Sequence, residues 1–269
     1  MKCIFSRKDS DSSKSVEHII PESLGNDTLI LDKGWVCDQC NNYFAVKIEQ
    51  QLLELPFFKQ YRHELNIENK RGNIPDQEGF IIDPDYSKIK FKKHRNGQKN
   101  IEIDSDDLKK VLKSKRKKIP AFTISAIPPY FNRYVSRFLG KIGIEALALE
   151  AHLNGYGEEH YNQDSLDNIK KYVRRAGKDD YWPYKVRNLY SSDHTFQNNK
   201  GLFKIISGWE FIITNEQQLL FQFLFLGTEF TIDLLRSDIG TIEAWLKENN
   251  FRSPVLESMQ KNIATMEKD

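Results

Sequence analysis

The stretch KSVEHIIPESLGN, residues 14–26, places an acid and an imidazole side by side inside an apolar run. Glu17 and His18 are flanked by Val16 on one side and by Ile19 and Ile20 on the other. A charged pair among aliphatic side chains is unfavourable unless it is hydrogen-bonded, ion-paired or engaged with a ligand. The stretch has the composition of a strand followed by turn residues, and it therefore predicts a short strand that carries the pair to a turn.

Cysteines flank this stretch on both sides. Cys3, Cys37 and Cys40 are the three cysteines of the chain, and all lie within its first 40 residues. An odd, clustered set favours metal ligation over disulfides. The spacing Cys37-x-x-Cys40 suits two thiolates at two corners of a tetrahedral zinc site. A fourth thiolate would be expected at position 6, where the chain has a serine. The fourth ligand therefore stays open between water and a distant histidine such as His63, and so does the alternative that the site binds no zinc stably.

The residues between and after the cysteines predict a hairpin followed by a helix. A second strand is expected at residues 33–37, after the turn-forming residues 21–27. Phe44, Ile48 and Leu52 then recur at a spacing of four, which predicts a helix from Cys40 to about residue 55, ended by a proline.

These parts, in this order, resemble the HNH nucleases, which have the ββα-metal or His-Me finger fold. The resemblance is carried by Cys3, by EHIIPESLGN at residues 17–26 and by CDQCNNYFAVKIE at residues 37–49. It implies that His18 is a general base and that Glu17 and Asn41 hold one divalent ion, Mg²⁺ or Mn²⁺, at the scissile phosphate. It also implies a structural Zn²⁺ at the cysteines.

Three neighbouring residues are further candidates. Asn42 would replace Asn41 if the register is shifted by one residue. Glu49 is expected two turns further along the same helix face, behind the metal ligands, and Lys47 is a candidate phosphate contact. Adjacent strand residues point to opposite faces, so Glu17 and His18 can meet at one phosphate only if the chain bends between or beside them.

The remaining sequence predicts an α+β chain with two domains, a finger at residues 1–58 and a larger mixed α+β domain of unknown role at residues 59–269. A hairpin is expected at residues 88–104, with its turn at Asn96-Gly97. Helices are expected at about 104–117, 129–154, 164–176 and 241–248, the second of them as the central core helix. Strands are expected at about 202–214 and 218–235.

Positive charge is concentrated in one segment. Residues 88–118 carry thirteen Lys or Arg against four Asp or Glu, 13 − 4 = +9, whereas residues 1–60 carry seven against nine, 7 − 9 = −2. A basic run is typical of a solvated face or of a surface that binds phosphates. The candidate DNA contacts are Lys113, Lys115, Arg116, Lys117 and Lys118, with Arg133, Arg137 and Lys141 on the next helix as additions.

The favoured hypothesis is a metal-dependent endonuclease that cuts DNA, with double-stranded DNA as the expected substrate, and that acts as a phage-defence or restriction effector. No run of about 18 apolar residues occurs, and the first residues lack the apolar core of a secretion signal, so we expect a cytoplasmic protein. The alternatives are a non-catalytic zinc-finger-type protein that binds nucleic acid through its basic surface, and a finger that is only a structural appendage. The sequence does not determine whether a partner protein or a homo-oligomer is involved.

Overall fold

A computed structural model of the chain describes residues 1–69, 71–82, 86–113 and 118–265. Internal contacts divide the chain into two compact units. The larger unit comprises residues 1–19, 30–49 and 128–269, and the smaller unit comprises residues 20–29 and 50–127. The chain is α+β, as predicted. The domain boundary at residue 58 stays a prediction, because a division by contacts does not test which segments fold or act as a unit.

The larger unit is built on a four-stranded antiparallel sheet in the order β10-β11-β12-β7. Its strands are β7 (Tyr184–Asn188), β10 (Ser207–Ile213), β11 (Leu219–Phe225) and β12 (Thr228–Asp233). The central strand β11 has the sequence LLFQFLF and is buried on both faces beyond its first residue. Since side chains alternate between faces, its phenylalanines point to one side of the sheet and Leu220 and Leu224 to the other.

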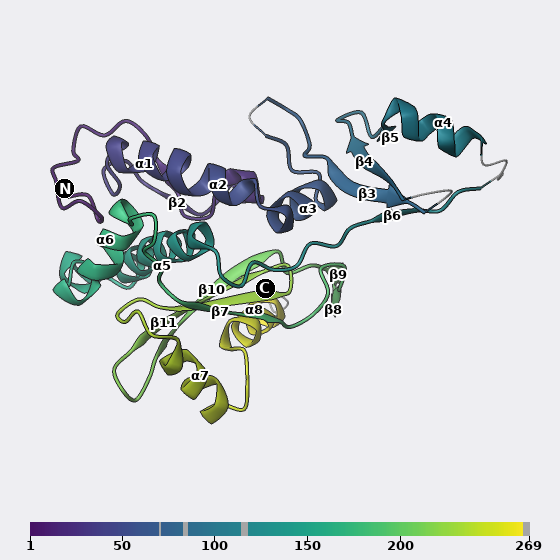
Figure 1. The fold of residues 1–269 in the computed structure, drawn as a ribbon. Helices are drawn as coiled ribbons and strands as arrows, with labels where there is room; N and C mark the ends of the chain where they lie inside the picture. The colour runs from purple at the N-terminus through teal and green to yellow at the C-terminus, as the bar shows by residue number, and fades with distance from the viewer. Residues whose placement is uncertain (70, 83–85, 114–117, 266–269) are drawn as a thin grey trace. The chain divides into compact units, whose positions relative to one another are not determined.

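Helices cover both faces of this sheet (Figure 1). The long helix α5 (Arg133–Leu153) packs on the phenylalanine face, where the rings of Phe138 and Phe223 lie 6.0 Å apart. Helices α7 (Ile239–Glu248) and α8 (Pro254–Thr265) cover the leucine face, with Ile242 against Leu220 and Val255 against Leu224. The result is a three-layer unit in which α5 is the buried helix that the sequence predicts for residues 129–154.

Another helix, α6 (Asp167–Arg175), packs closely against α5. A Cβ at Gly140 would lie 2.8 Å from the side chain of Val173, so the absence of a side chain permits this approach. The short elements around α6 are η3 (Glu158–His160) and η4 (Asp164–Leu166), and a hairpin of β8 (Phe196–Asn198) and β9 (Gly201–Phe203) lies further along the chain.

The N-terminal segment contributes β1 (Glu17–His18), β2 (Ile30–Leu31), α1 (Asp38–Phe44) and the π-helical turn η2 (Ala45–Glu49) to the larger unit. β1 and β2 pair antiparallel, so a hairpin precedes the helix as predicted. The expected position of its second strand, residues 33–37, is wrong. Gly34 has a φ of 95°, and the Trp35 amide donates to the Asp32 carbonyl at 3.3 Å, so these residues turn and deliver Cys37 to the start of α1.

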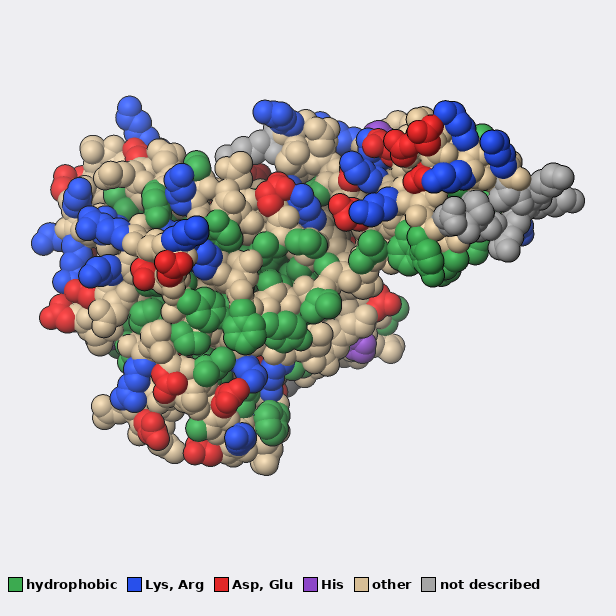
Figure 2. Space-filling view, viewed as in Figure 1, with side chains coloured by type: hydrophobic (Ala, Val, Ile, Leu, Met, Phe, Trp, Pro, Cys, Tyr) green, Lys and Arg blue, Asp and Glu red, His purple; other side chains and the backbone are tan. Residues whose placement is uncertain are grey.

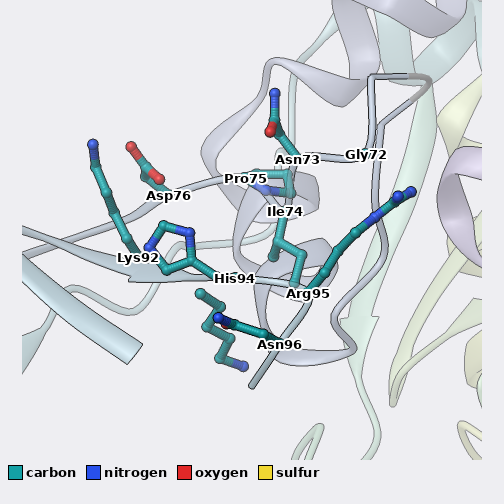
Figure 3. Close-up of a pocket in the computed structure, with 10 residues that line it drawn as sticks. Gly72, Asn73, Ile74, Pro75, Asp76, Lys92, His94, Arg95 and Asn96 are labelled. Carbon is teal, nitrogen blue, oxygen red and sulfur yellow. The ribbon is translucent and has the colours of Figure 1, made fainter. Parts of the chain in front are cut away.

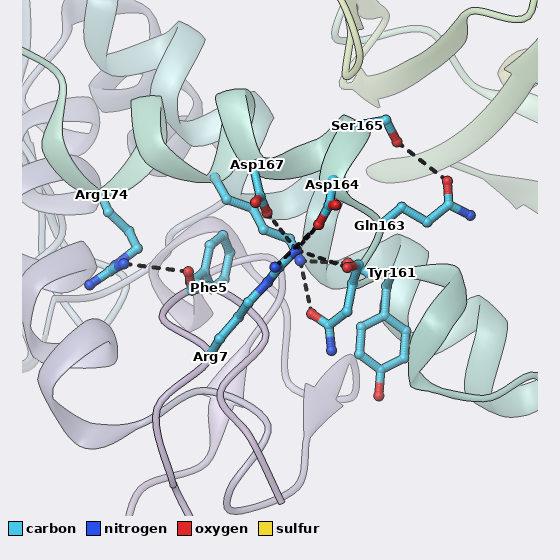
Figure 4. A network of polar contacts seen from close by, with 10 residues as sticks. Phe5, Arg7, Tyr161, Gln163, Asp164, Ser165, Asp167 and Arg174 are labelled. Atoms are coloured by element: carbon cyan, nitrogen blue, oxygen red, sulfur yellow. Dashed lines mark hydrogen bonds and ion pairs between the residues drawn. The ribbon is translucent and has the colours of Figure 1, made fainter.

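Polar contacts fasten the N-terminal loop to α6 (Figure 4). Arg7 donates to a carboxylate oxygen of Asp167 at 2.6 Å and to the Asn162 carbonyl at 2.8 Å. The Arg174 side chain lies 3.5 Å from the Phe5 carbonyl. The loop that carries Cys3 is therefore held by the same helix that packs against α5.

The smaller unit contains a four-stranded antiparallel sheet in the order β5-β4-β3-β6. Its elements are η1 (Glu22–Leu24), α2 (Gln50–Leu53), α3 (Pro56–Glu64), β3 (Gln77–Ile81), β4 (Ser87–Lys93), β5 (Lys99–Ile103), α4 (Ser105–Lys113) and β6 (Ala121–Thr123). The predicted hairpin at residues 88–104 is present, and Gly97 has the positive φ of 80° that its turn requires. Within the described residues, no helix combines the length and the apolar character needed to cross a bilayer.

Candidate active site and metal centre

Hydrogen bonds from α1 hold the segment that leads into Glu17. The Asp38 carboxylate, in the first turn of α1, accepts from the backbone amides of Lys14 and Ser15 at 3.0–3.2 Å. One turn later, the Asn41 side chain donates its Nδ2 hydrogen to the Val16 carbonyl at 2.9 Å. The Ser15 hydroxyl also donates to the Asp38 carboxylate, and this bond is the largest cause of the lowered pKa of Asp38, followed by the bonds from the Ser15 and Lys14 amides. The helix thus brings Asn41 beside the residue that immediately precedes Glu17.

A buried group of charged side chains lies behind β1, and we call it the carboxylate cluster: Glu17, Glu49, Glu145 and Lys141. The Lys141 ammonium lies 2.6 Å from Glu17 Oε1, 3.0 Å from Glu49 Oε1 and 3.0 Å from Glu145 Oε2. The side chains of Lys141 and Glu145 have an exposed fraction of 0%, and that of Glu17 has 5%. Charges removed from water so completely require partners of opposite sign, and the single lysine supplies them for three carboxylates.

The pKa values in this cluster follow from burial and from the charge imbalance. Burial raises the pKa of Glu17, and the attraction of Lys141 only partly offsets it. The pKa of Glu145 is raised well above its ordinary value by burial in the same way. Burial disfavours the Lys141 ammonium, but Glu145, Glu17 and Glu49 together outweigh that effect and raise its pKa well above the ordinary value. Lys141 is therefore a permanent cation at neutral pH.

Two atoms of the acid–imidazole pair are buried without a hydrogen-bond partner among the described residues: Glu17 Oε2 and His18 Nδ1. Such atoms are rare in folded proteins and indicate strain, an unplaced water or ion, or a catalytic role. A carboxylate oxygen is the type of ligand that Mg²⁺ and Mn²⁺ prefer, and an imidazole nitrogen without a proton can accept one from water. The residues present therefore fit a divalent ion held through Glu17, with an imidazole nitrogen on the next residue that has no hydrogen-bond partner among the described residues.

A second group, which we call the thiol cluster, is formed by Cys3, Cys37 and Cys40. All three residues are buried, and their sulfur atoms lie within 4.8 Å of one another. A hydrogen bond with Cys40 lowers the pKa of the Cys3 thiol to about 4, and the same bond, together with burial, raises the pKa of Cys40. Three converging sulfurs from two distant chain segments fit three corners of a tetrahedral zinc site.

Ser6 lies beside the thiol cluster. Its hydroxyl oxygen is 3.7 Å from Cys37 Sγ. The distant histidine that the sequence offered as an alternative, His63, is buried in the smaller unit, and its Nδ1 lies 2.7 Å from the Pro75 carbonyl. Among the described residues, the group of side chains able to hold a metal here contains the three cysteines and no histidine.

Comparison with known proteins addresses this same segment. Residues 3–55 match the model of a family described as HNH endonuclease. The N-terminal segment belongs to the HNH endonuclease family. No curated protein and no solved structure matches the chain. The match covers both clusters except for Lys141 and Glu145, which α5 contributes from outside the HNH segment.

The candidate residues of the HNH segment differ in their contacts and in their exposure. Glu17 and His18 are adjacent on β1, and Asn41 of α1 donates to the carbonyl of Val16, which precedes them. Glu49 is linked to Glu17 through Lys141. Asn42 is exposed, and no hydrogen bond places it at this site among the described residues. Lys47 is also exposed, as a side chain that binds phosphate must be.

Two of the additional DNA contacts expected on α5 are wrong. Arg137 is 3% exposed, and its guanidinium lies 2.6 Å from the Val173 carbonyl and 2.7 Å from the Tyr43 hydroxyl. Lys141 is 0% exposed. Both cations face the protein interior because α5 is packed on all sides by the sheet, α6 and η2. Arg133 is half-buried and donates to the Ala176 and Lys178 carbonyls.

Residues outside the expected set also shape the site. Asn26, in the loop of the HNH segment, donates to the Ile20 carbonyl at 2.7 Å and accepts from the Leu29 amide at 3.0 Å, which holds the loop closed. Glu145 was missed, and Lys141 was expected to contact DNA and not to pair with Glu17. A charged i, i+4 pair inside the apolar run FLGKIGIEALAL, residues 138–149, was the signal that could have identified them.

A pocket of about 740 Å³ lies elsewhere, in the smaller unit (Figure 3). Two segments line it, residues 72–76 and residues 92–96, and they include Lys92, His94 and Arg95. None of the site residues of the HNH segment is among its lining residues. Of the candidate DNA contacts in the basic run, Lys113 and Lys118 are exposed, whereas Lys115, Arg116 and Lys117 fall outside the described residues.

Proposed function

We propose that the protein is a metal-dependent endonuclease that hydrolyses DNA phosphodiester bonds, with double-stranded DNA as its substrate. The observation that carries this proposal is the pair of orphaned buried atoms, Glu17 Oε2 and His18 Nδ1, within a segment of the HNH endonuclease family. A metal-binding oxygen and a proton-accepting nitrogen on adjacent residues are the two groups that hydrolysis of a phosphodiester needs from the protein.

In this proposal each residue of the pair has a separate role. His18 Nδ1 takes a proton from the attacking water, and it is available because no protein donor occupies it among the described residues. Glu17 Oε2, with Asn41 beside it, holds Mg²⁺ or Mn²⁺, which when bound supplies positive charge to the phosphate and to the leaving oxygen. Lys141 occupies the other oxygen of Glu17. The thiol cluster holds a structural Zn²⁺.

The decisive experiment is a cleavage assay with purified protein, supercoiled plasmid and Mg²⁺, Mn²⁺ or EDTA. We expect nicked or linear product with either ion and none with EDTA. His160→Ala is a suitable control for histidine substitutions, because His160 is exposed and lies in a surface turn. Metal-independent DNA binding without cleavage would contradict the proposal and favour the alternative, a zinc-finger-type binding protein. Cleavage of RNA in place of DNA would correct the substrate.

The surface that holds DNA is a separate question, because the HNH segment itself has little positive charge. One candidate is the predicted set Lys115, Arg116, Lys117 and Lys118. The second candidate is a set of exposed cations on α6 and just after it: Lys171, Arg175 and Lys178. Figure 2 shows Lys and Arg side chains gathered in the region of α6. Removing one cation that binds a phosphate should reduce the log–log salt slope of duplex binding by about 0.9.

Reversing the charge of each set, one set at a time, tests these surfaces against each other. We expect the charge-reversed set that binds DNA to weaken binding and to flatten its salt dependence, while cleavage at saturating DNA and low salt persists. Slopes equal to that of the wild type in both variants would show that neither set binds the phosphates.

Two further expectations need cells or the intact protein. A role in phage defence or restriction stays a prediction, and comparing phage infection of cells that carry the wild-type or His18→Ala protein would test it. The predicted cytoplasmic location and any partner or homo-oligomer likewise stay open to measurement.

A further inference from the structure

The Lys141 ammonium is surrounded by oxygen atoms. Besides the three carboxylates, the His18 carbonyl lies at 3.2 Å and the Ile19 carbonyl at 3.5 Å from its Nζ. The ammonium has three hydrogens to donate, and five oxygens lie at 2.6–3.5 Å from its Nζ. This lysine comes from α5, more than 120 residues away from β1 in the sequence.

The two carbonyls give information about the backbone. Successive carbonyls of a regular strand point in opposite directions, so two neighbours cannot both face one cation. Because those of His18 and Ile19 do, the chain bends at residues 19 and 20, where β1 ends. The bend follows directly after Glu17 and His18, beside which a bend is expected from the sequence.

Lys141 contacts one of the two oxygens of Glu17 and leaves the other without a partner in the part of the chain that the structure describes. Oε1 accepts from the ammonium at 2.6 Å, whereas Oε2 is buried and has no partner among the described residues. A carboxylate with one oxygen fixed cannot rotate freely, so the other oxygen has a defined direction. Partners that hold a metal ligand in this way commonly change metal affinity by about 10- to 100-fold when they are removed.

We propose that Lys141 is the positioning residue of the HNH site: it fixes Glu17 so that Oε2 faces the metal, and it holds the bend that sets His18 beside it. The inference rests on the proposed function only in that it assumes a divalent ion at Glu17. It assigns a role to α5, which lies outside the HNH segment. A merely stabilising role is a weak explanation, because a buried ion pair adds little net stability over apolar residues of the same size.

The test measures Mn²⁺ binding without DNA, by electron paramagnetic resonance of free Mn²⁺. Lys141→Met removes the ammonium and keeps a side chain of similar length. Lys170→Met is the matched control, since Lys170 is also a buried lysine, 2% exposed, that donates to Asn162 Oδ1 at 3.0 Å. We expect Lys141→Met to bind Mn²⁺ at least about tenfold more weakly than the wild type, and Lys170→Met to bind it equally well.

A second variant keeps the test usable if Lys141→Met does not fold. It also distinguishes the positioning of Glu17 by Lys141 from the effect of the positive charge of Lys141. Counted with all four side chains ionised, the carboxylate cluster has a formal charge of 1 − 3 = −2 from one lysine and three glutamates. Lys141→Met/Glu145→Met keeps that value, since Glu17 and Glu49 remain. If Lys141 acts by position, this double variant also binds Mn²⁺ at least about tenfold more weakly. Wild-type affinity in the double variant would overturn the proposal, because charge alone would then suffice.

The remaining outcomes are equally decisive. Wild-type or tighter Mn²⁺ binding by folded Lys141→Met would overturn the proposal, and tighter binding would mean that the ammonium competes with the metal. Loss of folding in both variants, judged by circular dichroism, would overturn it in favour of a structural role. A wild-type protein that binds Mn²⁺ but cuts no DNA would refute the proposed function and leave the role of Lys141 supported by the variants.

Discussion

The thiol cluster and the carboxylate cluster lie in the same unit, but they collect their members over very different stretches of sequence. The thiol cluster lies entirely within residues 3–40, and its members all come from the HNH segment. The carboxylate cluster joins Glu17 and Glu49 to two residues of α5, Lys141 and Glu145.

The difference follows from the chemistry of the two ligand types. A buried thiol is a small, weakly polar group that needs no counter-ion until it binds metal. A buried carboxylate is unfavourable without an opposite charge, so it must recruit one wherever the fold can provide it. The comparison teaches that a soft metal site can be specified locally, whereas a buried oxygen site depends on the packing of distant elements.

The largest expected effect comes from removing His18, the proposed base beside the carboxylate cluster. His18→Ala should reduce the cleavage rate by about 10²- to 10⁴-fold, because general-base assistance is lost. If the two clusters are independent, zinc content and thermal midpoint should stay at the wild-type values. Plasmid cleavage, elemental analysis and thermal unfolding measure the three quantities. Cleavage at the wild-type rate would exclude His18 as the base.

Removing a sulfur from the thiol cluster should change the two quantities that His18→Ala leaves at their wild-type values, the zinc content and the thermal midpoint. Cys40→Ala removes one of three sulfurs, so we expect loss of zinc and a lower thermal midpoint. Structural zinc can contribute on the order of 10 kcal/mol to the folding of a small domain, although the larger unit would buttress this segment. Elemental analysis and thermal unfolding, with and without added zinc, provide the measurement. An unchanged midpoint would show that the thiol cluster adds no stability.

Completing the thiol cluster should have a smaller effect, in the favourable direction. Ser6→Cys places a fourth sulfur where the serine hydroxyl lies 3.7 Å from Cys37 Sγ. We expect tighter zinc binding, at one ion per chain, and a higher thermal midpoint. Competition with a coloured chelator measures the affinity. Full, tightly bound zinc in the wild type would mean that another ligand already occupies the fourth position.

The smallest effect is expected at Asp38, which lies between Cys37 and Cys40 in the sequence. Its folded-state pKa is lowered by hydrogen bonds from Ser15 and Lys14, so its stabilising contribution is present above the ordinary aspartate pKa. It is lost as the pH falls through the lowered, folded-state pKa. Asp38→Asn should therefore lower the thermal midpoint at pH 7, and the difference from the wild type should shrink at the most acidic pH. A difference independent of pH would exclude the carboxylate charge as its cause.

Several elements were predictable because their signals are local. The helical run of residues 38–53 follows the spacing of Phe44, Ile48 and Leu52, and the hairpin turn of the smaller unit follows Asn96-Gly97. The error at residues 33–37 is equally local. A strand was predicted there because these residues follow a turn and have strand composition, but Gly34 adopts a positive φ and turns the chain. Strand composition therefore did not outweigh one turn residue.

The sequence by itself determined the order of the HNH parts, the acid–imidazole pair and the three thiols, since spacing along one short segment specifies them. Only the tertiary structure decided what surrounds Glu17. Lys141 and Arg137 read as surface cations in the sequence, and the fold buries both because α5 is enclosed by the sheet, α6 and η2. A cation's partners depend on which elements pack against its helix, and residues more than 120 positions apart meet through that packing alone.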